Sequence, residues 1–258
     1  EISSCDWSSD VCSSDLLMSK PGLVLDTIKN SDIRLYDIKT GDAGKLLSSR
    51  RDINVMIFAC TEPSALYSST AKLMKPALYD LAGLVGQDVR VAEDTTSKQL
   101  LAALKNRSGC LVRGKGIFSV SDNMKDAVSI VKIIEKSIEA EMYGSKIGGI
   151  KHLTDEEAIR TNRLHNSMYS NVNSGGQVDF VNISQDEFKI RNDMIDCSHK
   201  LKYLGLFHGS WGNMSVRLNS QEMLVTPSAM EYANIRTEDI VKVDINTLEK
   251  FVDRKSVV

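Results

Sequence analysis

The longest amphipathic pattern in this 258-residue sequence lies at residues 122–143, and a helix of this kind needs a core to cover. Its apolar side chains recur at helical spacing, at Ala127, Ile130, Val131, Ile134, Ile138 and Met142. Asp122 is placed to cap the start and Gly144 to end the helix. Because one whole face is apolar, we expect this helix to pack on a sheet or on other helices.

Short apolar runs before and inside this region predict the sheet. We expect strands at 53–59, 109–112 and 117–120, and helices at 64–75 and 97–104. The run at 53–59 is apolar almost throughout, which predicts a strand buried on both faces. Residues 113–116 read Arg-Gly-Lys-Gly and predict a tight turn between two of the strands.

The second half of the chain repeats this mixture of helix and strand. Ser184 and Glu187 form the sequence pattern of a capping box, and Gly205 follows the last apolar position of the expected helix. Its predicted apolar face comprises Ile190, Met194, Cys197, Leu201 and Leu204. Strands are expected at 213–218, 223–226 and 240–245, with a turn at 236–239. The whole chain is therefore predicted to be α/β or α+β.

Charge and composition exclude several classes of function. The formal net charge is −2, which argues against a nucleic-acid partner bound through a basic surface. No apolar stretch reaches the ~18–20 residues that cross a bilayer, so we expect no membrane partner. Cys60, Cys110 and Cys197 show no C-x-x-C spacing, which is typical of a reducing cytoplasm.

The two ends read unlike the rest. Residues 1–16 nearly repeat a Ser-Ser-Asp unit without helical or strand periodicity, and they resemble the translation of a sequencing-library adapter. Residues 253–258 resemble the translation of the partner adapter. We therefore expect both ends to be artefacts, and the chain between them to be a fragment of a longer protein.

Two neighbouring blocks carry the most chemical information. The first is Gly-Ser-Trp-Gly-Asn-Met-Ser-Val-Arg-Leu at 209–218, and the second is Met-Leu-Val-Thr-Pro-Ser-Ala-Met-Glu-Tyr at 223–232. Loops of small residues leave main-chain N–H groups unused, and such groups attract anions without needing a charged side chain. The pattern predicts an anion site, while each small residue taken alone is equally typical of an ordinary turn.

Together, and with the segment at 238–244, these blocks resemble the N-terminal half of the class II aldolase/adducin family over residues 184–246. The resemblance rests on a helix, then Gly-Asn-x-Ser-x-Arg, then Thr-Pro-Ser-x-Met. It implies that Gly212, Asn213, Ser228 and Ala229 hold a substrate phosphate. Ala229 stands where the family usually has glycine, which restricts the turn but keeps its N–H.

The first half is similar to the C-terminal half of the same kind of domain, over residues 53–149. We therefore expect a tandem: residues 17–150 from a first domain, a linker at 151–183, and residues 184–252 from a second domain. Docking of the two complementary halves as one permuted domain is a further hypothesis. The implied fold is α/β, a three-layer αβα class II aldolase-like architecture with a central mixed or antiparallel sheet flanked by helices.

The family's chemistry implies a divalent metal, zinc or manganese, that stabilises an enediolate. The expected ligands are three histidines, and their positions fall on Ala59, Thr61 and Lys115, none of which matches. The chain has only four histidines, and none has ligand spacing. No metal ligand is therefore identified, although the resemblance implies a metal for the parent protein.

Three readings of the first domain stay open. It is a degenerate partner kept for packing, a binder of an anionic ligand without chemistry, or a site in which Lys115 replaces the metal's charge. Lys115 and Glu62 are the weak candidates for a catalytic role, and each is also typical of a solvated turn. Cys60 and Cys110 lie in apolar runs, so we expect both to be buried.

The resemblance implies a parent protein that is a cytoplasmic, homo-oligomeric aldehyde-lyase or epimerase acting on a small phosphorylated sugar. The fragment itself is expected to be inactive. The alternative is an adducin-like module that serves binding or assembly without catalysis.

Overall fold

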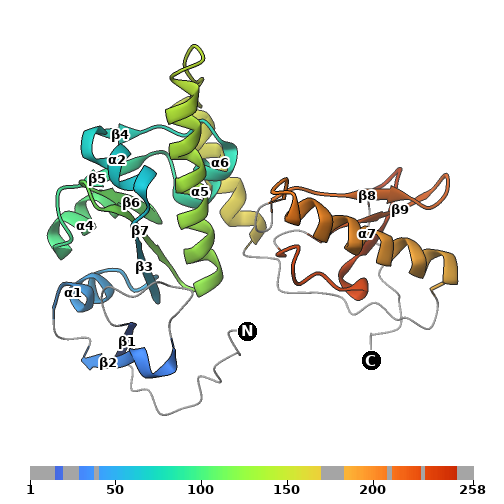
Figure 1. The fold of residues 1–258 in the computed structure, drawn as a ribbon, viewed down its shortest axis with the longest axis horizontal. Helices are drawn as coiled ribbons and strands as arrows, with labels where there is room; N and C mark the ends of the chain where they lie inside the picture. The colour runs from blue at the N-terminus through green and yellow to red at the C-terminus, as the bar shows by residue number, and fades with distance from the viewer. Residues whose placement is uncertain are drawn as a thin grey trace. The chain divides into compact units, whose positions relative to one another are not determined.

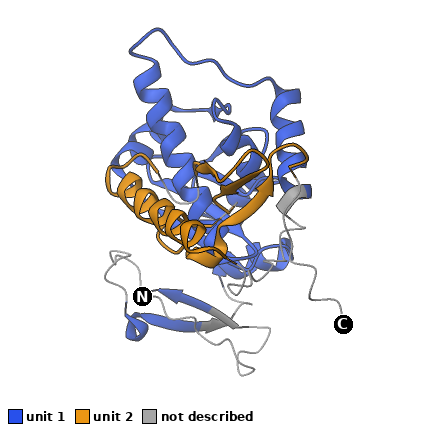
Figure 2. Cartoon of the chain, turned by 90° about the vertical axis from the view of Figure 1, so that its right-hand side faces the viewer, with its two compact units in different colours: residues 1–169 blue, residues 170–258 orange. Residues whose placement is uncertain are grey.

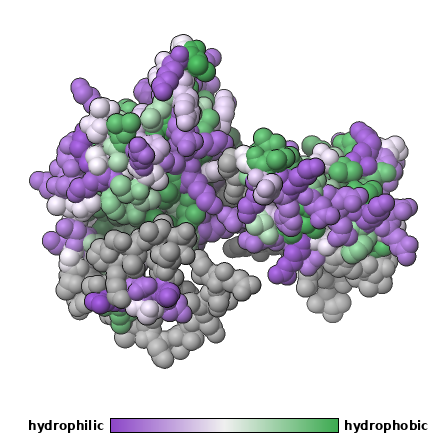
Figure 3. All heavy atoms as spheres, viewed as in Figure 1, coloured by the Kyte–Doolittle hydropathy of each residue, from purple (hydrophilic) through white to green (hydrophobic). Residues whose placement is uncertain are grey.

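The structure is a computed structural model that describes residues 15–19, 29–37, 41–169, 183–207, 211–227 and 230–248. The chain divides into two compact units, residues 1–169 and residues 170–258 (Figure 1, Figure 2). No helix in the described ranges is both long and apolar enough to span a membrane. The face shown in Figure 3 is mostly hydrophilic where it is described, with separate apolar patches.

Unit 1 contains a mixed five-stranded sheet with the order β3-β7-β6-β5-β4. The strands are β3 (Val55–Ala59), β4 (Leu73–Met74), β5 (Val89–Ala92), β6 (Gly109–Val112) and β7 (Gly116–Ser121). Strands β5 and β6 pair in parallel, and the other pairs are antiparallel. A separate antiparallel hairpin pairs β1 (Asp15–Ser19) with β2 (Ile33–Asp37), which the short 3-10 helix η2 (Asn30–Asp32) precedes.

Helices lie on both faces of the five-stranded sheet. They are α1 (Gly41–Ser49), α2 (Glu62–Thr70), α3 (Tyr79–Val85), α4 (Ser97–Leu104), α5 (Met124–Gly144) and α6 (Asp155–Tyr169). Helices α2 and α5 contact each other and β7, while α1 contacts α4, which covers β5 and β6 (Figure 1). The predicted α/β class, with a central mixed sheet flanked by helices, is confirmed.

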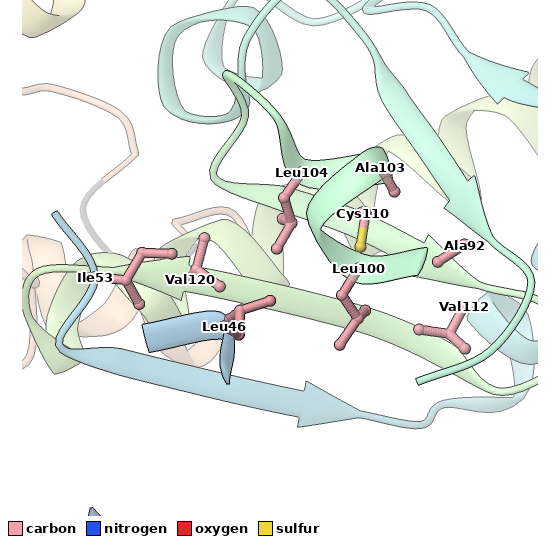
Figure 4. Packing of buried hydrophobic residues seen from close by; sticks show 9 residues of the cluster. All are labelled: Leu46, Ile53, Ala92, Leu100, Ala103, Leu104, Cys110, Val112 and Val120. Carbon is pink, nitrogen blue, oxygen red and sulfur yellow. The ribbon is translucent and has the colours of Figure 1, made fainter. Parts of the chain in front are cut away.

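Side chains alternate along β6 and β7, so these strands pack against helices on both faces of the sheet. Cys110, Val112 and Val120 join the core on the α1 and α4 side (Figure 4). On the α5 side, the buried hydroxyl of Ser119 donates to the main-chain oxygen of Ala127 at 3.0 Å. Neighbouring residues of a strand point to opposite faces, so both faces of these central strands must be buried.

Unit 2 contains an antiparallel three-stranded sheet with the order β10-β9-β8 and one helix. Its elements are α7 (Gln185–Tyr203), β8 (Ser215–Arg217), β9 (Glu222–Val225), the 3-10 helix η4 (Thr237–Asp239) and β10 (Val241–Asp244). The buried apolar cluster comprises Met194, Leu224, Tyr232, Ile235 and Ile240. The three predicted strands form this sheet, in which β9 pairs antiparallel with both β8 and β10.

Several local predictions for unit 1 need correction. Strand β3 is an edge strand rather than one buried on both faces, and Phe58 is 45% exposed. Helix α2 begins two residues earlier than predicted because Thr61 caps it, accepting from Ser64 N at 3.2 Å, and Pro63 is tolerated in the first turn. Helix α5 is capped by Asn123 rather than Asp122, through a 2.9 Å bond from Asp126 N.

The predicted face of α7 is also partly wrong. Met194 is buried, but Cys197 is exposed and Leu204 is 57% exposed. The buried positions of the helix are Glu187, Arg191, Met194 and Ser198. Three of these four residues are polar, so a search for an apolar stripe selects the wrong set. The capping by Ser184 is confirmed, since it accepts from Glu187 N at 3.1 Å.

Candidate functional site

In unit 1, the candidate site lies where three strands end at the same edge of the sheet. Strands β3 and β6 both pair antiparallel with β7, and β5 pairs parallel with β6, so β3, β5 and β6 run in one direction. The segments that follow them are 60–62, 93–94 and 113–115. Ligands of open α/β sheets bind outside the carboxyl ends of such strands, so this edge is the natural place for chemistry.

The turn at 113–116 approaches the end of β3 very closely. Lys115 N donates to Val112 O at 3.0 Å, which closes the turn, and Gly116 has a φ of +137°. A Cβ at Gly116 would collide with the carbonyl oxygen of Ala59 and lie 3.0 Å from Cys60 Cα. The structure therefore places the Lys115 turn beside the Ala59–Thr61 segment, as the resemblance implies for three metal-ligand positions.

Thr61 has a structural partner at this edge. Its hydroxyl oxygen lies 2.7 Å and 2.8 Å from the two carboxylate oxygens of Glu135, which α5 presents to the start of α2. Burial raises the pKa of Glu135, the hydrogen bond from Thr61 opposes that rise, and the nearby charge of Glu139 adds to it. The Thr61 hydroxyl thus joins α2 to α5.

Lys115 and Glu62, the two charged candidates at this edge, are exposed to solvent. Hydrogen bonds from Thr96 lower the pKa of Asp94, and the charge of Lys115 contributes further, which places that ammonium group near this carboxylate. Glu62 is the first residue of α2. The structure brings Lys115 to the expected edge but shows no contact between it and Glu62.

The side chains at the three implied ligand positions do not fit a divalent metal. Ala59 offers no donor atom, Thr61 offers a hydroxyl already used by Glu135, and Lys115 offers a cationic ammonium group. Zinc sites in proteins need deprotonated sulfur, imidazole or carboxylate ligands. Within the described ranges, no group of three His, Cys, Asp or Glu side chains is arranged to hold a metal ion.

The two cysteines of unit 1 differ in accessibility. Cys110 is fully buried, and burial raises the pKa of its thiol to about 12. Cys60, in contrast, is exposed at the end of the edge strand β3, which corrects the expectation that both are buried. The apolar neighbours of Cys60 belong to an edge strand, which is less buried than the central strands of the sheet.

In unit 2, the two sequence blocks lie side by side at the end of the sheet. Met214 N donates to the Thr226 hydroxyl at 3.0 Å, and Thr226 N donates to Met214 O at 2.9 Å. The Thr226 hydroxyl also lies 3.5 Å from the Tyr232 hydroxyl, beneath which the Phe207 and Tyr232 rings pack with centroids 4.3 Å apart. Thr226 therefore joins the two blocks.

Gly212 and Asn213 are exposed beside this junction. Gly212 has a φ of +110°, and a Cβ there would lie 2.8 Å from the Phe207 ring, so this conformation favours glycine. In the described part of the chain, neither residue's main-chain N–H has a hydrogen-bond partner. The other two predicted phosphate residues, Ser228 and Ala229, lie outside the described residues.

These features define a class of protein: an α/β fold with a mixed sheet, and a pair of loops in which the described residues Gly212 and Asn213 have unpartnered main-chain N–H groups. A family model, class II aldolase and adducin N-terminal domain, matches residues 4–142 and 192–256. The chain therefore belongs to the class II aldolase and adducin family. The match overlaps residues 1–16, whose adapter origin stays a prediction, as does the tandem arrangement.

Solved structures show the same fold. An L-fuculose 1-phosphate aldolase is 23% identical with a TM-score of 0.55, over 59% of this chain and 81% of that one. The L-fuculose 1-phosphate aldolase from Glaciozyma antarctica PI12 is 15% identical with a TM-score of 0.50, over 58% of this chain and 67% of that one.

One curated relative matches a shorter stretch at higher identity. It is the 5-methylthioribulose-1-phosphate/5-deoxyribulose-1-phosphate aldolase of Rhodospirillum rubrum, which is 40% identical over 55 residues. That stretch is 21% of this chain and 24% of the relative, so the chain spans about a quarter of the relative's length in this match.

Proposed function

We propose that the parent protein is a metal-dependent aldehyde-lyase or epimerase, acting on a small sugar phosphate through an enediolate, and that the unit 2 loops hold the phosphate. The supporting observation is the Met214–Thr226 junction, which keeps the two loops together, while the N–H groups of Gly212 and Asn213 have no partner among the residues that the structure describes. All three relatives named above are aldolases of sugar phosphates, which supports the same substrate class.

The chemistry assigns different tasks to the loops and to the rest of the protein. Main-chain N–H groups bind a phosphate without placing a cation beside the reacting carbon, so the loops contribute binding and orientation. An enediolate needs positive charge near its oxygens, and Ala59, Thr61 and Lys115, at the three implied positions of unit 1, offer no metal ligands for that purpose. We therefore place the metal and the proton-transferring acid in the completed second domain of the parent.

The rival proposal is an adducin-like module that binds or assembles without catalysis. It is favoured by one observation: Ala59, Thr61 and Lys115 lie at the carboxyl edge of unit 1, and none of their side chains is suited to binding a divalent metal. Under either proposal we expect a cytoplasmic homo-oligomer. Metal analysis of the purified parent separates the two: bound zinc or manganese supports the enzyme, and its lack supports the module.

The phosphate role of the loops is tested on the full 258-residue chain by NMR titration with inorganic phosphate. We expect saturable shifts of the Gly212 and Asn213 amide signals. Gly212→Ala should weaken this binding because the added Cβ displaces Phe207, whereas Ser220→Ala, in the exposed turn before β9, should leave it unchanged. Equal affinity in both variants would contradict the proposal.

A further inference from the structure

A polar cavity lies at the opposite edge of the unit 1 sheet from the candidate site. Its volume is about 380 Å³, and its lining includes Arg50 and Asp52 before β3, Val85 before β5, and Lys105–Ser108 before β6. Since β3, β5 and β6 run in one direction, these segments are at the amino ends of the three strands. The cavity is therefore separate from the edge that carries Thr61 and Lys115.

A buried arginine supplies the strongest donor in this cavity. The Arg107 side chain is only 5% exposed, and its Nε and Nη2 donate to the two carboxylate oxygens of Asp88 at 2.6 Å and 2.7 Å. Within the described residues, its Nη1 has no partner. This nitrogen is not among the buried side-chain atoms that lack a partner in the described residues, so it is open to the cavity and available to an acceptor there.

Two further cations stand at the cavity, and only one is paired. Arg50 donates to both carboxylate oxygens of Asp52, at 2.8 Å and 2.6 Å, and to Lys105 O at 2.7 Å. Lys105 is exposed, forms no ion pair among the described residues, and has a φ of +27°, which is unusual for a residue other than glycine. Arg50, Lys105 and Arg107 face two carboxylates, and Arg90 shares one of them, Asp88, at 3.6 Å, so positive charge exceeds negative charge at this edge.

Several helix-end carbonyls beside the cavity are engaged by side chains. Helices α3 and α4 both end beside the cavity, and the carbonyl groups at a helix C-terminus carry partial negative charge. Three of those carbonyls already accept hydrogen bonds from side chains. Asn162 Nδ2 donates to Ala82 O and Gly83 O at 3.1 Å and 2.7 Å, and Arg50 takes Lys105 O. The donors left for a ligand are therefore the Arg107 Nη1 group and the Lys105 ammonium group.

We propose that this cavity binds the phosphate group of a small hydroxylated metabolite. The phosphate accepts from Arg107 Nη1 and from Lys105, since both offer charge-assisted hydrogen bonds that suit a dianion. The Asn106 amide and the Ser108 hydroxyl also line the cavity, form no side-chain hydrogen bond with the described residues, and are suited to sugar-like hydroxyl groups. This site is independent of the unit 2 loops and of the proposed lyase or epimerase activity.

The test is an NMR titration of the full chain at low ionic strength with three probes: inorganic phosphate, ribose 5-phosphate and ribose. We expect saturable shifts at residues 105–108 with both phosphates, tighter binding of ribose 5-phosphate, and none with ribose. Lys105→Ala should weaken both phosphates about tenfold, the usual effect of losing one charge-assisted hydrogen bond. Lys98→Ala, on the exposed surface of α4, is the matched control.

Residue resolution keeps this proposal separate from that for unit 2, because shifts at Gly212 and Asn213 report the other site. Circular dichroism checks that each variant is folded. Equal loss of affinity in Lys105→Ala and Lys98→Ala would overturn the proposal, since it would show general attraction by surface charge. So would binding of ribose as tight as that of ribose 5-phosphate, or a lack of shifts at residues 105–108 with every probe.

Discussion

The carboxylate of Glu187 and the guanidinium of Arg191, one turn apart on α7, form a buried ion pair. Glu187 Oε1 accepts from Arg191 Nε at 3.0 Å and from Nη2 at 2.7 Å, and both side chains are less than 10% exposed. The other oxygen, Oε2, lies 2.5 Å from Nζ of Lys242 on β10. Arg191 Nη1 donates in turn to Thr237 O and Ile240 O, so the pair joins α7 to the segment before β10.

Glu187→Gln should destabilise unit 2. The substitution keeps the size of the side chain but leaves two cations without their counter-charge, and breaking a buried pair costs about 3–5 kcal/mol. Hydrogen exchange of β9 and β10 peptides measures the loss in free energy of opening. Asp186→Asn, at the neighbouring exposed position, is the control and should change it little. Equal effects of both changes would show that the ion pair does not hold the sheet to the helix.

The same pair predicts how the stability of unit 2 depends on pH. Burial alone would raise the pKa of Glu187, but the hydrogen bonds from Lys242 and Arg191 outweigh it and hold this pKa below its ordinary value of 4.5. A carboxyl group whose pKa is lower in the folded state stabilises the fold above its ordinary pKa. Stability should therefore fall as the pH decreases from 4.5, and Glu187→Gln should lose that dependence when unfolding is followed by denaturant titration.

Glu187 also illustrates which structural features could be predicted from the sequence and which could not. Its spacing from Ser184 correctly predicted a helix start, but a capping pattern contains no information about Lys242, which comes from a strand 55 positions later. The stripe at 122–143 and the strands at 109–120 were predictable because each pattern is local. Burial on β3 was not, because the same apolar run suits a central strand or an edge strand.

In the candidate site, too, the local features were predictable from the sequence and the long-range ones were not. The sequence placed Gly212 and Asn213 in a loop near the second block, and the junction through Thr226 agrees with that placement. The polar cavity near Arg107 was missed, because it is assembled from three strand starts and α6. Paired acidic and basic residues at those starts, such as Arg50 with Asp52, are the only local signal, and they are common on any surface.

Glu135→Gln should slightly stabilise the fold at neutral pH, whereas Glu187→Gln should destabilise it. Burial raises the pKa of Glu135 in the folded state, so its contribution to stability is present below the ordinary pKa of 4.5 and lost as the pH rises through the folded value. A neutral glutamine keeps an oxygen for the Thr61 hydroxyl and removes the cost of the charge. At pH 7 we expect a small gain, less than about 1 kcal/mol for this half-exposed group, in thermal denaturation. A loss of stability would contradict it.

The three described cysteines should separate by reactivity. A brief treatment of the native chain with iodoacetamide, followed by peptide mapping, should label Cys60 and Cys197, which are exposed, and spare Cys110. Burial and a pKa of about 12 deny Cys110 both access and the thiolate form. In urea all three should react alike. Early labelling of Cys110 in the native chain would show that the α1 and α4 side of the core opens readily.

The close approach of β7 to β3 predicts that Gly116 cannot be replaced. In Gly116→Ala the new methyl group meets the Ala59 carbonyl in a backbone conformation that suits glycine, so we expect a loss of at least about 2 kcal/mol in unfolding free energy. Gly114→Ala, two residues away, has open space around its Cβ and a φ of +61°, so it should cost about 1 kcal/mol. Urea denaturation followed by hydrogen exchange of β3 and β7 peptides compares the two. Equal losses would mean that the Lys115 turn does not press against the end of β3, and the two segments would then not form one site.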